Sequence, residues 1–249
     1  MNVKKLLFNN VIRGGGDTPT PTATLTTDSL YTHLDAKDIS LKNWHDRMGH
    51  YDFTTSSPIN SSENRFNLNR QTATSTNFTF GSFPFTLEFA VNITETHDWG
   101  RLFANNKVVN DFKVCFRNNG YYGIYSNHMT PTSINYGISG NSVNDGTLHI
   151  LDFVFVSSKE LIIYLDGVKQ TDVKTNTFNT SMLGLVGYHF GCDGREPNNC
   201  IIGYVYSFRF YKKALSEYEV RCNCLYEATQ GRNSVASDTE QSYFLEKWN

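Results

Sequence analysis

The sequence is poor in charged residues, and this scarcity restricts the partners that the chain can have. Only 18% of its 249 residues are charged and the formal net charge is −2, whereas charged residues make up roughly 25% of an average globular chain. So little positive charge provides no basic surface for a phosphate backbone or an anionic membrane. We therefore expect no nucleic acid among its partners.

Long apolar runs are also missing. A membrane-spanning helix needs about 20 mostly apolar residues, and no stretch of the sequence approaches that length. The opening MNVKKLLFNNVIRGGG has only three consecutive large apolar residues before two asparagines. A secretory signal needs a longer apolar segment and a small-residue cleavage site. We expect neither a signal peptide nor membrane insertion. We expect the protein to assemble in a cytoplasm.

The number of cysteines is odd. Five cysteines cannot form a complete set of disulfides within one chain. Cys192 and Cys200 bracket a short loop and could pair, whereas the C-x-C of Cys222 and Cys224 lacks the spacing of most zinc knuckles. Buried free thiols in a reducing compartment are the interpretation that the sequence favours.

The motifs of common catalytic machinery are absent as well. The sequence has no phosphate-binding loop, no dinucleotide-binding glycine pattern, no H-E-x-x-H zinc motif and no nucleophile elbow. It also lacks internal repeats and coiled-coil heptads, which a long fibre shaft would require. Binding and structural roles remain.

Aromatic residues, by contrast, make up 14% of the chain. The run FTLEFAVNIT at 85–94 alternates apolar and other residues without interruption, which predicts a half-buried β-strand. Residues 148–156 are apolar on nearly both faces and predict a central strand packed on two sides. The pair Asp166-Gly167 lies between two apolar runs and predicts a tight hairpin, because both turn positions require a positive φ. These patterns predict an all-β protein.

A helical segment is expected after the last long strand. The run 204–211 is aromatic and strand-like, and Ser216 follows it with Glu219 three residues later. This is the spacing of a capping box, in which each side chain bonds the backbone N–H of the other residue. We expect one short helical turn at this point.

The two phrases that carry these features resemble part of a known family. LIIYLDGVKQ at 161–170 and IIGYVYSFRFYKKALSEYEV at 201–220 are similar to the last third of a laminin-G-like domain of the concanavalin A-like lectin superfamily. The residues of the second phrase that match the family pattern are Gly203, Val205, Phe208, Arg209, Tyr211, Ala214, Leu215, Ser216 and Glu219.

An earlier segment fits the same resemblance. Trp44, Asp46 and Gly49 resemble a W-x-D-x-x-G segment that follows the first strand in such domains. The resemblance implies a two-sheet antiparallel jelly-roll sandwich of the concanavalin A-like type over residues 27–230. It also implies a structural role for His149, while Trp44 is expected to anchor the core or a loop.

The composition divides the chain into four parts. Residues 1–16 form an N-terminal docking arm, 17–26 a flexible linker, 27–230 the jelly roll, and 231–249 a C-terminal tail with a short helix. The arm holds five large apolar side chains: Leu6, Leu7, Phe8, Val11 and Ile12. Their density favours docking on another protein over an incidental tail. The sequence leaves open whether the tail helix docks on its own sandwich or on a neighbouring subunit.

Binding residues are expected in rim loops, where aromatic and oxygen-bearing side chains meet. Sugar rings stack on exposed aromatic faces, and we predict glycan contacts for four aromatic residues: Trp99, Tyr121, Tyr122 and Tyr188. Many laminin-G-like domains use a rim calcium, and its candidate ligands here are four loop residues: Asp98, Asn105, Asp193 and Asn198. Ordinary turn formation explains these four as well, so we assign no cofactor and no metal ligand.

The resemblance also raises the question of catalysis, because glycoside hydrolases share this fold. They need two carboxylates that flank the scissile bond, and several families place them in an E-x-D-x-x-E string that this sequence lacks. Glu88 stands alone on its strand, and Asp152 stands alone among apolar neighbours. We therefore expect no enzymatic activity and assign no catalytic residue.

The favoured function is a phage virion structural protein: a head fibre, a capsid decoration or a tail appendage. The combination of arm, tether and jelly roll resembles laminin-G-like proteins of tailed phages that infect gut Bacteroidales. We expect the arm to bind other virion proteins, the jelly roll to bind host surface glycans, and the chain to form a homotrimer. The alternative is a bacterial cell-surface carbohydrate-binding module, and a glycoside hydrolase ranks third.

Overall fold

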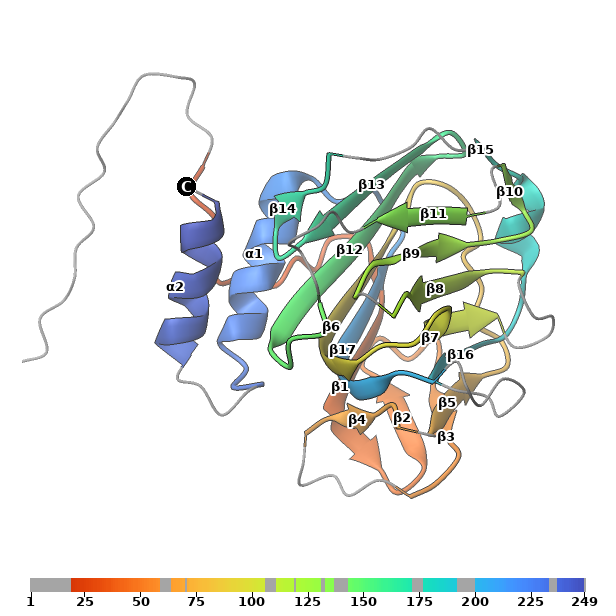
Figure 1. Cartoon of the computed structure of the whole chain (residues 1–249), viewed down its shortest axis with the longest axis horizontal. Coiled ribbons are helices and arrows are strands. Elements are labelled where there is room, and N and C mark those ends of the chain that lie inside the picture. The colour runs from red at the N-terminus through yellow and green to blue at the C-terminus, as the bar shows by residue number, and fades with distance from the viewer. Residues whose placement is uncertain are drawn as a thin grey trace, which may run out of the picture.

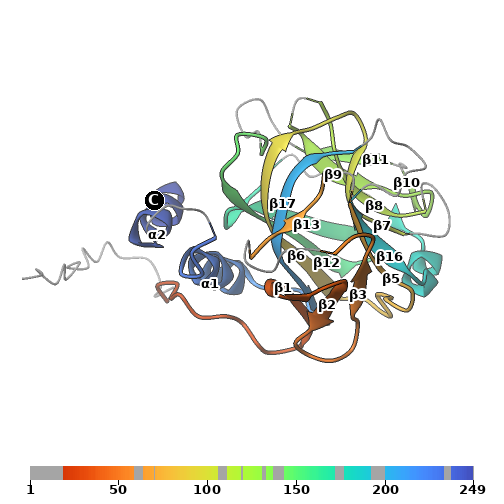
Figure 2. The same ribbon diagram turned by 90° about the horizontal axis from the view of Figure 1, so that it is seen from below.

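The computed structural model contains two antiparallel β-sheets packed face to face and two α-helices outside one of them (Figures 1 and 2). It describes residues 19–58, 64–69, 71–105, 111–118, 120–130, 133–136, 143–171, 177–191, 200–232 and 237–248. The predicted jelly-roll sandwich is confirmed. The arm residues Leu6, Leu7, Phe8, Val11 and Ile12 lie outside the described residues.

The sheet nearer the helices, called the helix-side sheet below, contains the longest strands. Its order is β14 (Val168–Lys169), β13 (Glu160–Leu165), β12 (Leu148–Ser157), β6 (Phe85–Glu95), β17 (Ile202–Tyr211) and β1 (Leu30–Ser40), and β4 (Phe66–Asn67) also pairs with β17. The opposite sheet continues with β2 (Asn43–Asp46), β3 (Phe53–Thr55), β5 (Thr72–Ser75), β16 (Tyr188–Gly191), β7 (Gly100–Asn105), β8 (Lys113–Phe116), β9 (Tyr122–Tyr125) and β11 (Ser133–Tyr136). A separate pair joins β10 (Met129–Thr130) to β15 (Thr177–Phe178).

Strand β1 links the two sheets. Its first half pairs with β17 and its second half with β2, and the register shifts between Leu34 and Ile39. The opposite sheet therefore begins where β1 turns away from β17. This geometry explains how one continuous path of hydrogen-bonded strands produces two packed layers.

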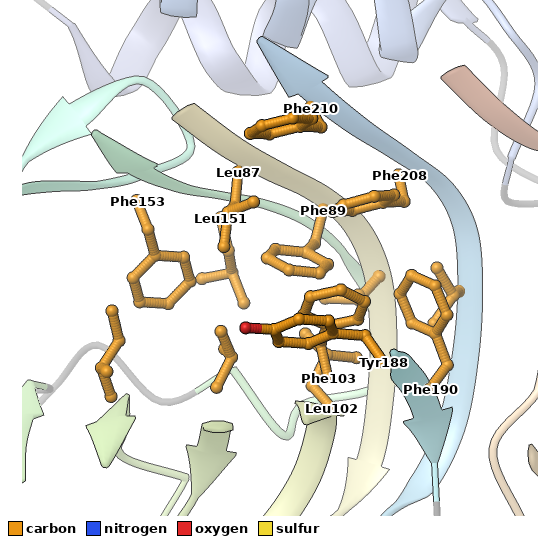
Figure 3. Close-up of a cluster of buried hydrophobic side chains, with 14 of the residues drawn as sticks. Leu87, Phe89, Leu102, Phe103, Leu151, Phe153, Tyr188, Phe190, Phe208 and Phe210 are labelled. Atoms are coloured by element: carbon orange, nitrogen blue, oxygen red, sulfur yellow. The ribbon is translucent and has the colours of Figure 1, made fainter. Parts of the chain in front are cut away.

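Aromatic side chains fill the space between the sheets (Figure 3). The Phe103 ring stacks on Tyr188 and on Phe208, with ring centroids 5.1 Å apart in both pairs. Phe89 and Phe153 reach the same cluster from the helix-side sheet. Burial stabilises each phenylalanine by about 1.5–3 kcal/mol, so this cluster supplies a large part of the driving force for folding.

Strand β6 shows the predicted alternation but not the predicted half-burial. Leu87 and Phe89 face the core between the sheets, whereas Ala90 belongs to a second apolar cluster on the outer face. Every residue from Phe85 to Ile93 is buried. The prediction of a half-buried strand was wrong because helix α1 (Glu217–Ala228) covers the outer face.

Helix α1 begins at the predicted capping box. The Ser216 hydroxyl accepts a hydrogen bond from the Glu219 N–H at 3.4 Å, and the Glu219 carboxylate accepts one from the Ser216 N–H at 2.9 Å. The helix has 12 residues rather than the single turn expected. It continues because Val220, Cys224 and other side chains find an apolar surface on the helix-side sheet.

A row of polar residues crosses the outer face of the helix-side sheet beneath α1. Strand register places His33, Arg209, Glu88, Asp152 and Tyr164 next to one another on five successive strands. The Arg209 guanidinium forms ion pairs with Glu88 and with Glu227 of α1. This buried charge network joins the helix to the sheet.

The network continues beyond Arg209 through a second arginine. Arg232 binds both carboxylate oxygens of Asp35 at 2.9 Å, and its Nε atom lies 2.8 Å from Glu227. The Asn223 amide donates to Glu88 at 2.6 Å and to the Tyr211 hydroxyl at 3.0 Å. The linker approaches the same region, because the N–H of Thr26 donates to the Asn223 side chain at 2.8 Å.

The predicted hairpin at Asp166 and Gly167 is confirmed, since both residues have a positive φ (54° and 75°). Asp166 is buried and binds His149 at 3.0 Å. Burial alone would lower the pKa of His149, but the charges and hydrogen bonds of Asp166 and Asp145 outweigh it and raise the pKa to about 9. His149 is therefore a charged structural residue at neutral pH, as its place in the family pattern implies.

Helix α2 (Ser237–Lys247) docks on its own chain, which answers the question that the sequence left open. Its Lys247 ammonium lies 2.5 Å from the Asp166 carboxylate, and the Trp248 indole donates to the Asp166 carbonyl at 2.7 Å. The α2 side chain Phe244 is buried in the cluster that α1 forms with the sheet. Figure 2 shows α2 on the far side of α1 from the sheets.

A 3₁₀ helix, η2 (Thr180–Gly184), capped by Asn179, precedes β16, which begins at Tyr188. One further sequence prediction needs correction. Cys200 is disulfide-bonded, not a free thiol. Cys192 lies outside the described residues.

Three other cysteines, Cys115, Cys222 and Cys224, are free and buried, as the sequence favours. Neither α1 nor α2 is long and apolar enough to cross a membrane, and no other helix in the described part of the chain is.

Candidate functional site

Two of the four aromatic residues predicted to bind glycans belong to the core instead. Tyr122 and Tyr188 are fully buried, and Figure 3 shows the Tyr188 ring between the sheets. Their strand positions explain this result, because Tyr122 pairs with the core residue Phe116 and Tyr188 lies two residues before the core residue Phe190. The prediction is wrong for these two residues.

Trp99 and Tyr121, the other two, are partly exposed. Trp99 lies in the turn between β6 and β7, where the Gly100 N–H bonds the His97 carbonyl at 2.9 Å. It adopts a positive φ of 64°, a conformation that costs a bulky residue about 1–2 kcal/mol. Such strain persists only where the surroundings impose it, and it is commonest at functional sites.

Three neighbours hold the Trp99 ring in place. The Arg117 guanidinium lies 4.2 Å from the ring centroid, and Tyr125 meets the ring edge-on at a centroid distance of 5.3 Å. The buried Lys113 ammonium lies 5.3 Å from the Trp99 ring and 4.9 Å from the Tyr125 ring. We call these four residues, together with Asp98, the Trp99 surface.

Asp98 ties the turn that carries Trp99 to the hairpin between β8 and β9. Its carboxylate accepts hydrogen bonds from the Arg117 Nε and from the Asn118 N–H, each at 3.2 Å. The hairpin itself is closed by the Arg117 N–H, which donates to the Tyr121 carbonyl at 2.7 Å. The Trp99 surface is therefore rigid, while the side chains of Arg117 and Asp98 are still 30% and 50% exposed.

This arrangement combines an aromatic ring with charged hydrogen-bonding groups. An apolar ring face suits the C–H side of a sugar, and the adjacent guanidinium and carboxylate suit its hydroxyl groups. The thiol of Cys115 on β8 offers no nucleophile, because burial raises its pKa to about 11 and the thiol is neutral. The groups that this surface presents are an aromatic ring, a guanidinium and a carboxylate.

The two calcium candidates that the structure describes, Asp98 and Asn105, are both engaged elsewhere. Asp98 is engaged by Arg117, and Asn105 is buried with its amide donating to the Gly187 carbonyl at 2.8 Å. Asp193 and Asn198 lie outside the described residues. Among the residues that the structure does describe, no three His, Cys, Asp or Glu side chains are grouped to hold a metal ion.

The family model of the concanavalin A-like lectin/glucanases superfamily, Laminin_G_3, matches residues 67–221, more than half of the chain. The chain belongs to this family. The laminin-G-like resemblance in its sequence is thereby confirmed. Among curated proteins, no relative matches the chain.

Solved structures similar to this concanavalin A-like chain come from several contexts. The Trypanosoma rangeli sialidase in complex with sialic acid has a TM-score of 0.62 at 14% identity, over 87% of this chain and 36% of the sialidase. Domain 4 of AbnA, a GH43 extracellular arabinanase from Geobacillus stearothermophilus, was solved in complex with arabinotriose. It has a TM-score of 0.56 at 14% identity, over 79% of this chain and 98% of the arabinanase domain. The binding domain of botulinum neurotoxin serotype D/C has a TM-score of 0.57 at 14% identity, over 82% of this chain and 53% of the neurotoxin chain.

These likenesses establish the fold alone. The chain spans only about a third of the length of the sialidase structures that it matches. Its similarity covers nearly all of the arabinanase domain. The fold thus occurs both as part of enzymes and within a toxin's binding domain.

Sequence reasoning missed Tyr125, Arg117 and Lys113, although strand parity contains the signal. Once Val114 and Phe116 are assigned to the core, Lys113 and Arg117 must face outward. The β8–β9 register then pairs Lys113 with Tyr125, and places Tyr125 on the outer face too. Aromatic character alone does not distinguish the two faces of a strand.

Proposed function

We propose that the jelly roll is a non-catalytic glycan-binding domain and that its ligand contacts the Trp99 surface. The observation that carries the proposal is the partly exposed Trp99 ring, which lies between Arg117 and Tyr125. The backbone of Trp99 has a positive φ, which fixes the direction of the side chain. A ring that is already immobilised loses little conformational entropy when a sugar stacks on it. Arg117 and Asp98 then supply the hydrogen bonds that select among sugars.

The position of two neighbouring carboxylates, Glu88 and Asp152, supports the absence of catalysis. Glycosidases need two carboxyl groups that flank the scissile bond in an open cleft. Glu88 and Asp152 are adjacent in register, but both are buried beneath α1. A polysaccharide cannot reach either of them without removal of the helix. We expect no turnover of any polysaccharide by the purified protein.

The test of the proposal is a binding measurement with a matched pair of variants. Arabinotriose is the first probe, because the similar arabinanase domain is in complex with it, and a glycan array extends the search. Trp99→Ala should weaken binding about tenfold or more, and Trp99→Phe should weaken it less. The exposed residue Tyr243 on α2 provides a control, Tyr243→Ala, that should leave affinity unchanged. Equal affinity of Trp99→Ala and the wild-type protein would refute the assignment.

The biological setting that we propose is a phage virion. In this setting residues 1–16 bind other virion proteins, and the jelly roll presents the Trp99 surface to host glycans. The apolar arm, the threonine-rich linker and the low charge of the chain support this proposal. The alternative is a bacterial cell-surface carbohydrate-binding module, which would use the same surface.

Truncation separates these two settings. Removal of residues 1–18 leaves Thr26 and its bond to Asn223 in place, so the domain should remain folded. The truncated protein should no longer be incorporated into its parent particle. Light scattering on both forms tests the expected homotrimer, and normal incorporation of the truncated form would refute a docking role for the arm.

A further inference from the structure

The loop between β2 and β3 is organised around one carboxylate. Asp46 accepts four backbone N–H bonds, all between 2.8 and 3.0 Å long, from His33, Met48, His50 and Tyr51. The loop therefore has a defined shape before any ligand arrives. This segment is the W-x-D-x-x-G motif of the sequence, and the Trp99 surface makes no use of it.

A polar hollow of about 430 Å³ opens beside this loop. Its lining residues are His45, Asp46, Gly49, His50, Asp52 and Asn77. Binding sites for small molecules begin at about 300 Å³, so the hollow has room for one or two sugar units. A Cβ atom added at Gly49 would meet no atom within 4 Å, which means that the space beside this residue is open.

The hydrogen bonds of the two histidines define what the hollow offers. His50 Nδ1 lies 2.7 Å from the Tyr31 carbonyl, and His45 Nδ1 lies 3.2 Å from the Asp52 carboxylate. Because a carbonyl and a carboxylate only accept, each Nδ1 must carry the proton. In the neutral form, each Nε2 is then an acceptor with no partner among the described residues.

Two further features fix the walls of the hollow. The His50 ring stacks on Tyr31 at a centroid distance of 3.8 Å, and the Lys212 ammonium lies 3.2 Å from the Tyr31 ring. On the other wall, the Asn77 carbonyl oxygen accepts a bond from the Ser75 hydroxyl at 2.8 Å. The Asn77 amide group is thereby left as the donor.

We infer that this hollow is a second binding site, for a single sugar unit with adjacent hydroxyl groups. The hydroxyls donate to the Nε2 atoms of His45 and His50 and to the Asp52 carboxylate, and the Asn77 amide donates to a sugar oxygen. A metal ion is a poorer occupant, since no group of three metal-binding side chains is present in the described residues. The site is distinct from the Trp99 surface, because Asn77 follows the end of β5 that lines up through Tyr188 of β16 with Asn105, and Asn105 is at the opposite end of β7 from Trp99.

The experiment uses the full chain, labelled with ¹³C at histidine Cε1, and follows the histidine signals by NMR. The probes are the methyl pyranosides of glucose, galactose, mannose and N-acetylglucosamine, added separately at millimolar concentrations. At least one should shift the signals of His45 and His50 and leave that of His149 unchanged. His149 is a suitable reference, because it is buried in the helix-side sheet and binds Asp166 at 3.0 Å.

Two substitutions then locate the binding. His50→Phe keeps the stack on Tyr31 but removes the Nε2 acceptor, and affinity should fall about five- to tenfold, the value of one hydrogen bond. Asparagine can adopt the positive φ of 75° at position 49. Its side chain would fill the open space of the hollow, so Gly49→Asn should abolish binding. Tyr243→Ala, on the exposed face of α2, should change nothing. The inference is overturned if no pyranoside shifts His45 and His50, or if Gly49→Asn binds as the wild-type protein does.

The two sites can fail independently. Trp99→Ala should leave the shifts of His45 and His50 intact, and Gly49→Asn should leave binding at the Trp99 surface intact. If either variant lost both the shifts of His45 and His50 and binding at the Trp99 surface, the protein would have one site and not two, which would contradict the inference.

Discussion

Replacement of Arg209 tests how helix α1 is held on the sheet. Arg209 is fully buried and is paired with both Glu88 and Glu227. Arg209→Met keeps most of the volume but leaves two carboxylates without their main counter-charge. Removal of one partner from a buried ion pair costs about 3–5 kcal/mol.

The remaining hydrogen bonds set the size of the effect. Glu88 retains its bond from Asn223, and Glu227 retains Arg232 and the Ser207 hydroxyl. We therefore expect the lower end of the range, about 3 kcal/mol. At about 2–4 °C for each kcal/mol in a chain of this size, Tm should fall by about 6–12 °C.

Equilibrium unfolding in urea, followed by circular dichroism, measures this loss. Lys159→Met, in the exposed turn after β12, is the control and should change stability by less than about 0.5 kcal/mol. The triple variant with Glu88→Gln and Glu227→Gln added should recover more than half of the loss, because the unpaired charges are gone. A loss below about 1 kcal/mol for Arg209→Met, the worth of a surface pair, would refute the reasoning.

Three further predictions concern the same half of the molecule. Burial raises the pKa of Asp152, whose two carboxyl oxygens have no hydrogen-bond partner among the described residues, so this group should cost stability as pH rises from acidic to neutral. Asp152→Asn should remove this contribution and add about 1–3 kcal/mol at pH 7, measured as the difference between variant and wild-type free energies of urea unfolding from pH 4 to 8, in which the contribution of His149 cancels. Gly167→Ala forces a Cβ to within 2.7 Å of Trp248 at a positive φ, and should cost about 1–2 kcal/mol and speed hydrogen exchange in α2. Ser216→Ala should cost about 1 kcal/mol through loss of the helix cap, measured by thermal unfolding.

Local signals in the sequence predicted several elements of the fold correctly. The hairpin at Asp166 and the capping box at Ser216 each depend on residues within a few positions of one another. The two-sided burial of residues 148–156 follows from composition alone. These features were predictable because the physics that determines them acts over a short stretch of chain.

The buried charge network was not predictable in the same way. Arg209, Glu88 and Glu227 lie far apart in the sequence, and a charged residue is normally expected at the surface. Only the register of β6 against β17 and the length of α1 bring the three together. The same helix explains why the outer face of β6 is buried although its sequence alternates.

The candidate site shows the corresponding limit for function. Trp99, Tyr122 and Tyr188 were predicted on the same ground, as aromatic residues of the rim, but only Trp99 is partly exposed, and Tyr122 and Tyr188 are core residues. Strand parity would have excluded Tyr122 and included Tyr125. The hydrogen bonds that turn His45 and His50 into acceptors depend on the folded loop, so spacing alone could not reveal them.

Substitutions on the two sheets should affect different properties of the molecule. The outer face of the helix-side sheet is covered by α1 and joined to it by buried charges, so a substitution there acts on stability. The Trp99 surface lies on strands and turns of the opposite sheet, where Arg117 and Asp98 remain partly exposed. Under the proposed function, substitutions at these exposed positions should change ligand preference at little cost to folding, since surface changes away from caps and buried charges usually shift stability by less than about 0.5 kcal/mol. Variation in ligand preference among related chains should therefore concentrate in the β6–β7 and β8–β9 turns, while Arg209 and Glu227 should vary only together.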